Sequence, residues 1–261
     1  MCRFVAYTGQ KEIFIKDLLK DPEHSLIKQS HGAREGTHGV NADGFGMAWY
    51  DSTIGVTPGI FKTIQPAWND SNLKHLCNKI QSNCFLAHIR ASTVGDVTKT
   101  NCHPFYYDKY SFVHNGTIRK FSKIKLRLLN YIKENLFLEI KGNTDSECFF
   151  FLVVHYLKNA NCSSLIEAVR KAFQWISDAQ SDEDIENFSR LNIAISDGNE
   201  LVATRCVVQN DDALSLYYVK QDGAFVIASE PLDDISNKWK EVPKNHYLRV
   251  KNGKESEVAP I

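Results

Sequence analysis

The chain has 261 residues, of which 43% are hydrophobic and 24% are charged. This length and composition are typical of a soluble globular protein with a sizeable core, folded as one large domain or two small ones. Lysine plus arginine equals aspartate plus glutamate, at 31 each, and no long basic block occurs. The electrostatic pattern of a nucleic-acid-binding protein is therefore missing.

Two features of the sequence bear on location and redox state. The longest apolar run, Cys148 to Tyr156, is far shorter than the roughly 18 to 20 residues of a membrane span, and no apolar signal segment begins the chain. We therefore predict a cytoplasmic protein with no membrane partner. The 7 cysteines are scattered and include no CxxC pair, so they predict neither a disulfide framework nor a zinc site. No metal and no cofactor are expected.

Strand patterns occupy both ends of the chain and helix patterns occupy its middle. Runs typical of strands lie at 3–7, 45–50, 59–64, 84–90, 111–113, 191–195, 201–208, 214–219 and 224–228. Apolar residues at helical spacing lie at 73–80, 124–132 and 165–176. This order predicts an α+β fold of two antiparallel sheets packed face to face, with helices outside. No repeat or linker divides the sequence, so we expect a single domain over residues 2–261.

The first motif is Cys2, directly behind Met1. Removal of methionine before a small residue is efficient and would leave Cys2 with a free α-amine. Because an α-amine titrates near about pH 8 and a thiol near about pH 8.5, the amine can act as base for the thiol of the same residue. Cys2 is therefore a candidate nucleophile. The alternative is a small hydrophobic residue at a strand edge.

The stretch at residues 41–50 reads NADGFGMAWY. Asp43-Gly44 predicts a turn that enters a strand, and Gly46 indicates that another backbone or a ligand approaches closely. No helix pattern follows, which excludes a dinucleotide-binding loop.

The end of the strand pattern at 84–90 carries His88-Ile89-Arg90. Alternation places His88 and Arg90 on one face of the strand. A guanidinium group is suited to a carboxylate, so Arg90 is a candidate for binding one; the alternative is a surface arginine. His103 follows on a loop before Pro104, where either a structural or a catalytic histidine could stand.

The pair Asn115-Gly116 stands between apolar residues in the stretch VHNGTI. This pattern predicts a tight type I′ hairpin turn, because both residues tolerate positive φ. Such a turn also presents an asparagine amide beside a glycine N–H. That pair of donors can stabilise the oxyanion of a tetrahedral intermediate, so the two interpretations stand side by side.

Asp145 lies in the stretch GNTDSE, ahead of the apolar run 148–157. Thr144 and Glu147 fit a capping box, which predicts that a helix begins here with Asp145 in its first turn. The helix dipole alone accounts for an acidic residue at this position. A fixed carboxylate of this kind is also suited to binding an ammonium group.

Together these candidates make one consistent set. They are a thiol with its own base, an oxyanion hole, a cation for a carboxylate and an anion for an ammonium group. The set fits an α-amino acid that is attacked at a carbonyl further along its side chain. Glutamine and γ-glutamyl compounds have this chemistry.

The sequence also resembles the class II glutamine amidotransferases, the N-terminal-nucleophile type. Its motifs follow the order of that family: Cys2 behind Met1, then NADGFGMAWY, HIR, HP, HNG and TDSE. The segments MCRFVAYTG and ASEPL (residues 228–232) are most similar in sequence to the stand-alone YafJ-like subgroup of this family. Relatives of that subgroup include γ-glutamyl hydrolases of ergothioneine synthesis and of fungal glutathione breakdown. The resemblance runs from residue 2 to about residue 245.

The resemblance implies a four-layer αββα N-terminal-nucleophile hydrolase fold that forms a single glutaminase domain. It implies that Cys2 is the nucleophile and that the α-amine of Cys2 is the base. The side chain of Asn115 and the N–H of Gly116 would form the oxyanion hole.

The resemblance also implies a set of substrate contacts. Arg90, with help from Thr93, would bind the α-carboxylate, and Asp145 would bind the α-ammonium group. His103 would have a positioning role. Ala91 stands where some relatives carry a tryptophan, so the lid over the site is expected to differ.

The implied reaction is hydrolysis of the γ-amide of glutamine or of a γ-glutamyl compound through a Cys2 γ-glutamyl thioester. Glutamate and ammonia or an amine would be released. Because the match leaves no room for a synthase domain, the expected partners are the small-molecule substrate and a separate ammonia-accepting or peptidase chain. The family also suggests a homodimer.

Two other interpretations remain open at this point. The chain could be a non-catalytic glutamine-binding or regulatory subunit of a partner enzyme. It could also be a redox-sensing protein that uses the thiol of Cys2 or Cys102.

Overall fold

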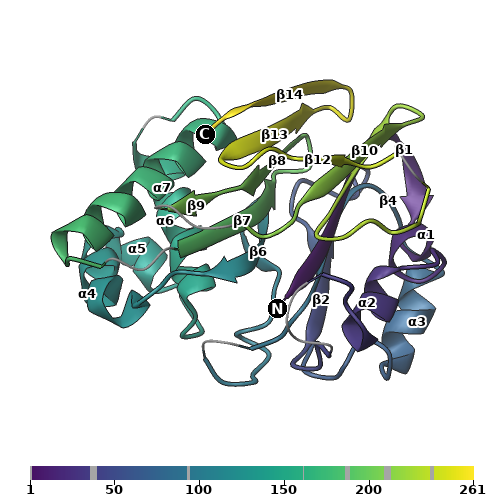
Figure 1. Cartoon of the computed structure of the whole chain (residues 1–261), viewed down its shortest axis with the longest axis horizontal. Helices are drawn as coiled ribbons and strands as arrows, with labels where there is room; N and C mark the ends of the chain where they lie inside the picture. Colours follow the sequence, from purple (N-terminus) through teal and green to yellow (C-terminus); the bar gives the residue numbers. More distant parts are fainter. Residues whose placement is uncertain are drawn as a thin grey trace.

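The computed structural model describes residues 2–35, 40–92, 95–160, 162–185, 189–208, 213–235 and 238–261. These residues form two β-sheets that lie face to face, with helices on both outer faces (Figure 1). The four layers confirm the predicted α+β architecture. Among the described residues no helix is long and apolar enough to cross a membrane.

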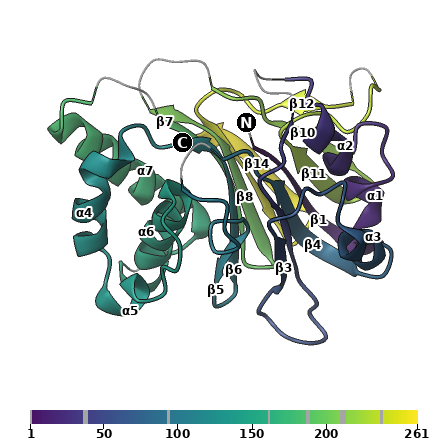
Figure 2. The same cartoon turned by 90° about the horizontal axis from the view of Figure 1, so that it is seen from below.

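The first sheet has the N-terminal strand near its centre. In spatial order its strands are β12 (Lys240–Glu241), β10 (Tyr217–Gln221), β11 (Ala224–Ala228), β1 (Arg3–Phe14), β4 (Gln81–Ile89), β2 (Phe45–Trp49) and β3 (Gly59–Thr63). Its outer face is covered by α1 (Lys16–Leu19), α2 (Leu26–His31) and α3 (Ser71–Cys77) (Figure 2).

The second sheet carries the remaining strands and the longer helices. Its order is β14 (Glu255–Pro260), β13 (His246–Lys251), β8 (Glu200–Arg205), β7 (Ser189–Ser196), β6 (Tyr110–Thr117) and β5 (Phe105–Tyr107), and β9 (Val207–Val208) pairs with β7. On its outer side lie α4 (Phe121–Tyr131), α5 (Glu134–Phe137), α6 (Asp145–Asn159) and α7 (Leu165–Asp182).

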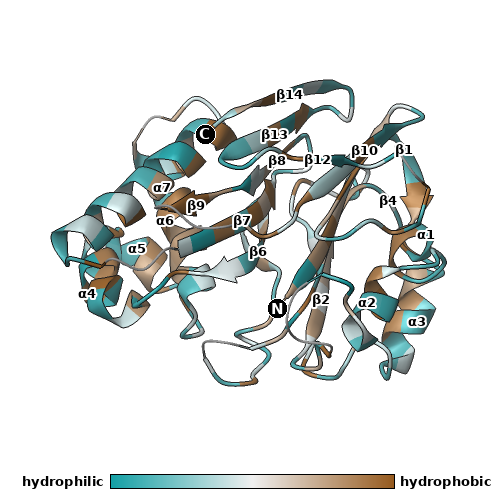
Figure 3. Ribbon diagram, viewed as in Figure 1, coloured by the Kyte–Doolittle hydropathy of each residue, from teal (hydrophilic) through white to brown (hydrophobic). Residues whose placement is uncertain are grey.

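Successive side chains of a strand point to opposite faces of its sheet, so the hydrophobic core has three parts. Phe4, Leu86 and Val113 meet between the two sheets. Val5 and the outer-facing residues of β4 pack under α1 to α3, whereas the aromatic residues of α6 pack with Phe112 on the other outer side. Figure 3 shows the hydrophobic residues gathered on the central strands. Successive residues at the start of β1 thus point to opposite faces, which places Cys2 on the side of the inter-sheet space.

The hairpin turn predicted at Asn115-Gly116 is wrong. Both residues lie inside β6, where they pair with Asn192 and Leu191 of β7. The reason for a glycine here is a close approach, since a Cβ on Gly116 would lie 2.0 Å from the carbonyl oxygen of Arg190. Pairing with β7 along the whole strand overrides the local turn preference of Asn-Gly.

The close approach predicted at Gly46 is confirmed. A Cβ at this position would lie 2.1 Å from the carbonyl oxygen of His103. Gly46 pairs with His88 on β4, so the His103-Pro104 backbone packs directly over the first sheet at this point. The glycine therefore allows His103 to reach the neighbourhood of β4.

Candidate active site

The thiol of Cys2 lies just ahead of β1, between the ends of β4 and β11. The N–H of Ala91 donates to Cys2 Sγ at 3.3 Å, and Sγ lies 3.4 Å from the carbonyl oxygen of the same residue. Burial raises the pKa of the Cys2 thiol, although the bond from Ala91 and the positive charges of Arg90 and Arg3 oppose this effect. A thiol of this kind is protonated at neutral pH and needs a base to react.

Arg90 follows β4 and is 3% exposed. Its guanidinium group donates to the carbonyl of Asp96 at 3.0 Å, to the Ser92 hydroxyl at 3.1 Å and to the carbonyl of Gly95 at 3.3 Å. These bonds hold the arginine against the loop that follows it. The Thr93 position predicted to assist Arg90 lies outside the described residues.

The turn at Asp43-Gly44 fixes the backbone of Arg90 from the other side. Arg90 N–H donates to the Gly44 carbonyl at 2.8 Å, and Asp43 N–H donates to the Arg90 carbonyl at 3.0 Å. The Asp43 carboxylate accepts the Ser92 N–H at 2.7 Å. The sequence predicted this turn but not its contact with Arg90, because the two segments are far apart along the chain.

Asn115 reaches the start of β1 from the second sheet. Its Nδ2 lies 3.4 Å from the Ser229 hydroxyl, and the same hydroxyl accepts the Phe4 N–H at 3.0 Å. Ser229 thus connects the amide of Asn115 to a residue two positions from Cys2. Ser229 was missed as a site residue, and only its place in the ASEPL stretch of the resemblance could have pointed to it.

Asp145 begins α6 and is 4% exposed. Its Oδ2 accepts the Ile118 N–H and its Oδ1 accepts the Ser146 N–H, both at 2.8 Å. Ile118 stands two residues after Gly116, so these bonds hold the carboxylate beside the end of β6. The predicted helix start is confirmed, and Thr144 caps it by accepting the Glu147 N–H at 3.1 Å.

The capping box at this helix start is incomplete. The Glu147 carboxylate accepts the N–H groups of Lys141 and Gly142, at 3.0 and 2.7 Å, and not the N–H of Thr144. It therefore fixes the segment that leads into Asp145.

Asn101 links the segments of Arg90 and Asp145. Its Nδ2 donates to the Asp96 carbonyl at 2.9 Å and to Asn143 Oδ1 at 2.8 Å, while its Oδ1 accepts the Asn143 N–H at 3.0 Å. Asp96 is the residue whose carbonyl holds Arg90, and Asn143 stands two residues before Asp145. The sequence offered no indication of this role for Asn101, because all of its partners are remote or on an irregular loop.

His103 stacks on His88 with their ring centres 4.1 Å apart. In the described part of the chain, no hydrogen-bond partner lies against either ring nitrogen of His103. Burial lowers the pKa of His88 to about 3 and lowers the pKa of His103 well below its ordinary value. Both rings are therefore neutral at pH 7 and pack against one another in the interior.

These two histidines predict a pH-dependent stability. Because their pKa values are lower in the folded state, the unfolded state binds more protons below about pH 6.5, and stability is lost as the pH falls from there toward about 3 for His88. Between about pH 7.5 and 5.5 His88 alone should cost about 1.4 kcal/mol of unfolding free energy, and His103 adds to the loss in the same direction. Urea denaturation over this range measures the loss, and His88→Asn should reduce it. Equal stability at both pH values would contradict the assignment.

A buried ion network anchors residues 2 and 3. Arg3 Nε lies 2.5 Å from the Glu230 carboxylate, and Arg3 Nη1 donates to the Cys2 carbonyl at 2.9 Å. His24 Nε2 lies 2.7 Å from the second carboxylate oxygen, which also accepts the Arg34 N–H at 2.9 Å. Although burial opposes it, these contacts lower the pKa of Glu230. The network holds the backbone at Cys2.

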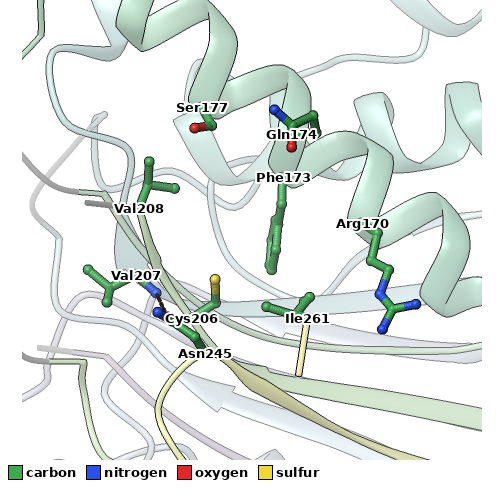
Figure 4. Close-up of a pocket in the computed structure, with 9 residues that line it drawn as sticks. All are labelled: Arg170, Phe173, Gln174, Ser177, Cys206, Val207, Val208, Asn245 and Ile261. Atoms are coloured by element: carbon green, nitrogen blue, oxygen red, sulfur yellow. Dashed lines mark hydrogen bonds between the residues drawn. The ribbon is translucent and has the colours of Figure 1, made fainter. Parts of the chain in front are cut away.

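The described residues contain no group of three or more His, Cys, Asp or Glu side chains that could hold a metal ion. A cavity of about 530 Å³ lies between α7 and the edge of the second sheet, where Phe173 points toward Cys206 and Ile261 (Figure 4). None of the predicted site residues lines it.

Comparisons with known proteins agree on one family. The model of the family described as glutamine amidotransferases class-II matches residues 20–260. A probable glutamine amidotransferase of Saccharomyces cerevisiae is 35% identical over 292 residues, covering 96% of this chain and 82% of the relative. A gamma-glutamyl-hercynylcysteine sulfoxide hydrolase of Mycobacterium tuberculosis is 27% identical, covering 96% of this chain and 93% of that protein.

Solved structures share the fold. A glutamine aminotransferase class-II domain protein from Silicibacter pomeroyi superposes with a TM-score of 0.73 at 24% identity, covering 100% of this chain and 99% of its own. The glutamine phosphoribosylpyrophosphate amidotransferase of B. subtilis has a TM-score of 0.65 at 14% identity, covering 99% of this chain and 49% of its own. At these identities the likeness concerns the fold alone.

Proposed function

Because the chain belongs to the class-II glutamine amidotransferases, we propose that it hydrolyses the γ-amide of glutamine or of a γ-glutamyl compound through a thioester on Cys2. The observation that carries the proposal is the hydrogen-bonded connection from Asn115 through Ser229 to Phe4, which places an amide donor of the second sheet at the start of β1. An amide donor so placed is suited to the oxyanion formed when the thiol of Cys2 attacks a carbonyl.

The first half of the reaction forms the thioester. After removal of Met1, the neutral α-amine of Cys2 takes the proton of the thiol, and the thiolate attacks the γ-carbonyl carbon. The side chain of Asn115 and the N–H of Gly116 stabilise the negative oxygen of the tetrahedral intermediate. When the intermediate collapses, the C–N bond breaks and the leaving nitrogen takes the proton held by the α-ammonium group.

The second half hydrolyses the thioester. The α-amine of Cys2 takes a proton from water, the hydroxide attacks the same carbon, and the C–S bond breaks to release glutamate. The thiol is restored with the proton from the α-ammonium group.

The glutamyl head is held by the residues on either side of the thiol. Arg90 binds the α-carboxylate, Asp145 binds the α-ammonium group, and His103 positions Arg90 through its contact with His88. The bonds of Asn101 keep the segments of Arg90 and Asp145 at a fixed separation. Preorganisation of this kind lowers the entropy that is lost when the substrate is ordered.

Substitution Asp145→Asn tests the ammonium contact. It keeps an oxygen that can accept the Ile118 N–H but removes the charge, so kcat/KM for glutamine should fall about tenfold to a hundredfold, mainly through KM. The matched substrate is glutaramate, which has the γ-amide but lacks the α-amine. Steady-state kinetics should show no further loss on glutaramate; an equal loss on both substrates would contradict the contact.

A glutamate-release screen over glutamine, glutathione and other γ-glutamyl amides tests the proposed function itself. Release from at least one of them is expected, whereas calorimetric binding of glutamine without glutamate release would indicate a non-catalytic binding subunit. We further propose that a separate chain accepts the ammonia or processes the amine product, and that the enzyme is a homodimer formed from one domain per chain.

A further inference from the structure

A cavity of about 520 Å³ opens between the edge strands of the two sheets. Its walls are the edge strands β3 and β5, the loop before β5, the segment after α5 and the first two turns of α6. In Figure 2, β5 lies between α5 and β3. The described lining residues include none of the active-site candidates Cys2, Arg90, Asn115 and Asp145. The cavity is therefore separate from the proposed active site.

Part of the cavity wall is aromatic. It includes Phe105 and Tyr107 of β5 and Phe151 of α6. Tyr107 packs edge-on against Phe151, with their ring centres 5.9 Å apart. Cavities of this volume that combine apolar walls with a few polar groups are typical of sites for small organic molecules. The cavity is thus larger than an inorganic ion requires.

Each carboxylate of the cavity wall already has a partner. The Glu147 carboxylate accepts two backbone N–H groups, those of residues 141 and 142. Glu139 lies 3.7 Å from Lys141 Nζ, and Asp108 lies 2.5 Å from Lys158 Nζ. These contacts stabilise the negative charges of the wall without the other lysines that line it.

The ammonium groups of Lys62 and Lys99 line the same cavity without a counter-ion. In the described part of the chain, neither group lies within ion-pair distance of a carboxylate or donates a hydrogen bond. Lys62 is half-buried, and its Nζ lies 5.5 Å from the centre of the Phe105 ring.

The two lysines also act on one another. Burial is the main cause that lowers the pKa of Lys62, and the positive charge of Lys99 acts in the same direction, although Glu147 opposes it. Positive charges that are partly removed from water and lack a counter-ion are stabilised when an anion binds between them. This wall of the cavity is therefore suited to an anion.

The kind of side chain indicates the class of anion. Lysine binds phosphate as a point charge, whereas the planar fork of arginine is the better match for a carboxylate. No arginine lines the described part of the cavity, and the hydroxyl of Thr100 stands beside Lys99 on the same wall. A phosphate monoester carries about 1.5 to 2 negative charges near pH 7, which matches two ammonium groups.

We propose that this cavity binds a phosphate monoester with an apolar organic portion. The phosphate lies at Lys62 and Lys99, and the organic portion lies against Tyr107 and Phe151. Binding at this site does not require glutamine hydrolysis, so its failure would leave the proposed function untouched.

Phenyl phosphate is the probe for this site. Phenyl sulfate has the same ring but only one negative charge, and inorganic phosphate has the charge but no ring. In isothermal titration calorimetry of the full chain, we expect phenyl phosphate to bind most tightly and each of the other two to bind about tenfold more weakly. Lys62→Gln should weaken phenyl phosphate binding about tenfold, and Lys99→Gln about threefold, because Lys99 is more exposed.

Two further variants serve as controls. Lys79→Gln removes another exposed lysine, one that does not line the cavity, and should bind phenyl phosphate as the wild type does. Lys62→Arg keeps the positive charge and should retain most of the affinity. Circular dichroism checks the fold of each variant. If Lys62→Gln does not fold, the exposed substitution Lys99→Gln still tests the site.

Absence of phenyl phosphate binding at about 10 mM would overturn the site. Equal affinity in the wild type and in the folded lysine variants of the cavity would also overturn it. Equal affinities for phenyl phosphate and inorganic phosphate would show an adventitious ion only, with no contribution from the aromatic wall.

Discussion

Cys2→Ala should abolish glutamate release. The substitution removes the sulfur that attacks the γ-carbonyl in the proposed reaction but keeps a small residue behind Met1, so processing of the N-terminus is retained. Loss of a nucleophile from a preorganised site costs on the order of 10⁴-fold or more in kcat. The Arg3 and Glu230 network does not involve the thiol, so the fold should persist. Glutamate formation by the purified variant, followed with a coupled dehydrogenase assay, measures the loss.

Cys162→Ala is the matched control for this loss. Cys162 is another free cysteine, partly buried against the core beside α6, and it contacts none of the proposed site residues. This variant should retain wild-type activity. Full activity in Cys2→Ala, or a comparable loss in Cys162→Ala, would be incompatible with Cys2 as the nucleophile.

Asn115→Ala should lower kcat about 10²-fold to 10³-fold while KM changes little, because in the proposed reaction the side-chain amide stabilises charge that develops only after attack begins. Ser229→Ala is a milder version of the same change. It removes the hydroxyl that contacts Asn115 Nδ2 at 3.4 Å but leaves the amide in place, so a smaller loss of kcat is expected.

Both effects should appear in kcat measured at saturating glutamine. A rise in KM with unchanged kcat in Asn115→Ala would assign this residue to ground-state binding instead of the oxyanion hole. Circular dichroism of both variants checks that β6 still pairs with β7.

The sheets and the long helices could be predicted because their patterns are local. The alternation of apolar and polar residues predicted β1, β4 and β11, and the helical spacing of apolar residues predicted α7. The strands at 246–251 and 255–260 were not predicted because their many charged and polar residues obscure the alternation of apolar and polar side chains. Both strands lie at or next to an edge of the second sheet. Edge strands are paired on one side only, so their sequences carry a weaker pattern.

The candidate site residues could be singled out from the sequence because each one combines a chemical group with a local feature, such as the start of a strand for Cys2 or the start of a helix for Asp145. Asn101 and Ser229 could not be predicted, since their contacts join segments that only the folded chain brings together. The strand at Asn115-Gly116 was hidden for the same reason, because long-range pairing with β7 decides its conformation.

The most direct test of the account is peptide mapping by mass spectrometry after treatment with diazo-oxo-norleucine, an electrophilic analogue of glutamine. We predict that the active protein lacks Met1, that activity falls in proportion to labelling, and that a single adduct lies on Cys2 at the N-terminus. An active protein that retains Met1, or inactivation with the adduct on another residue, would contradict the central claim.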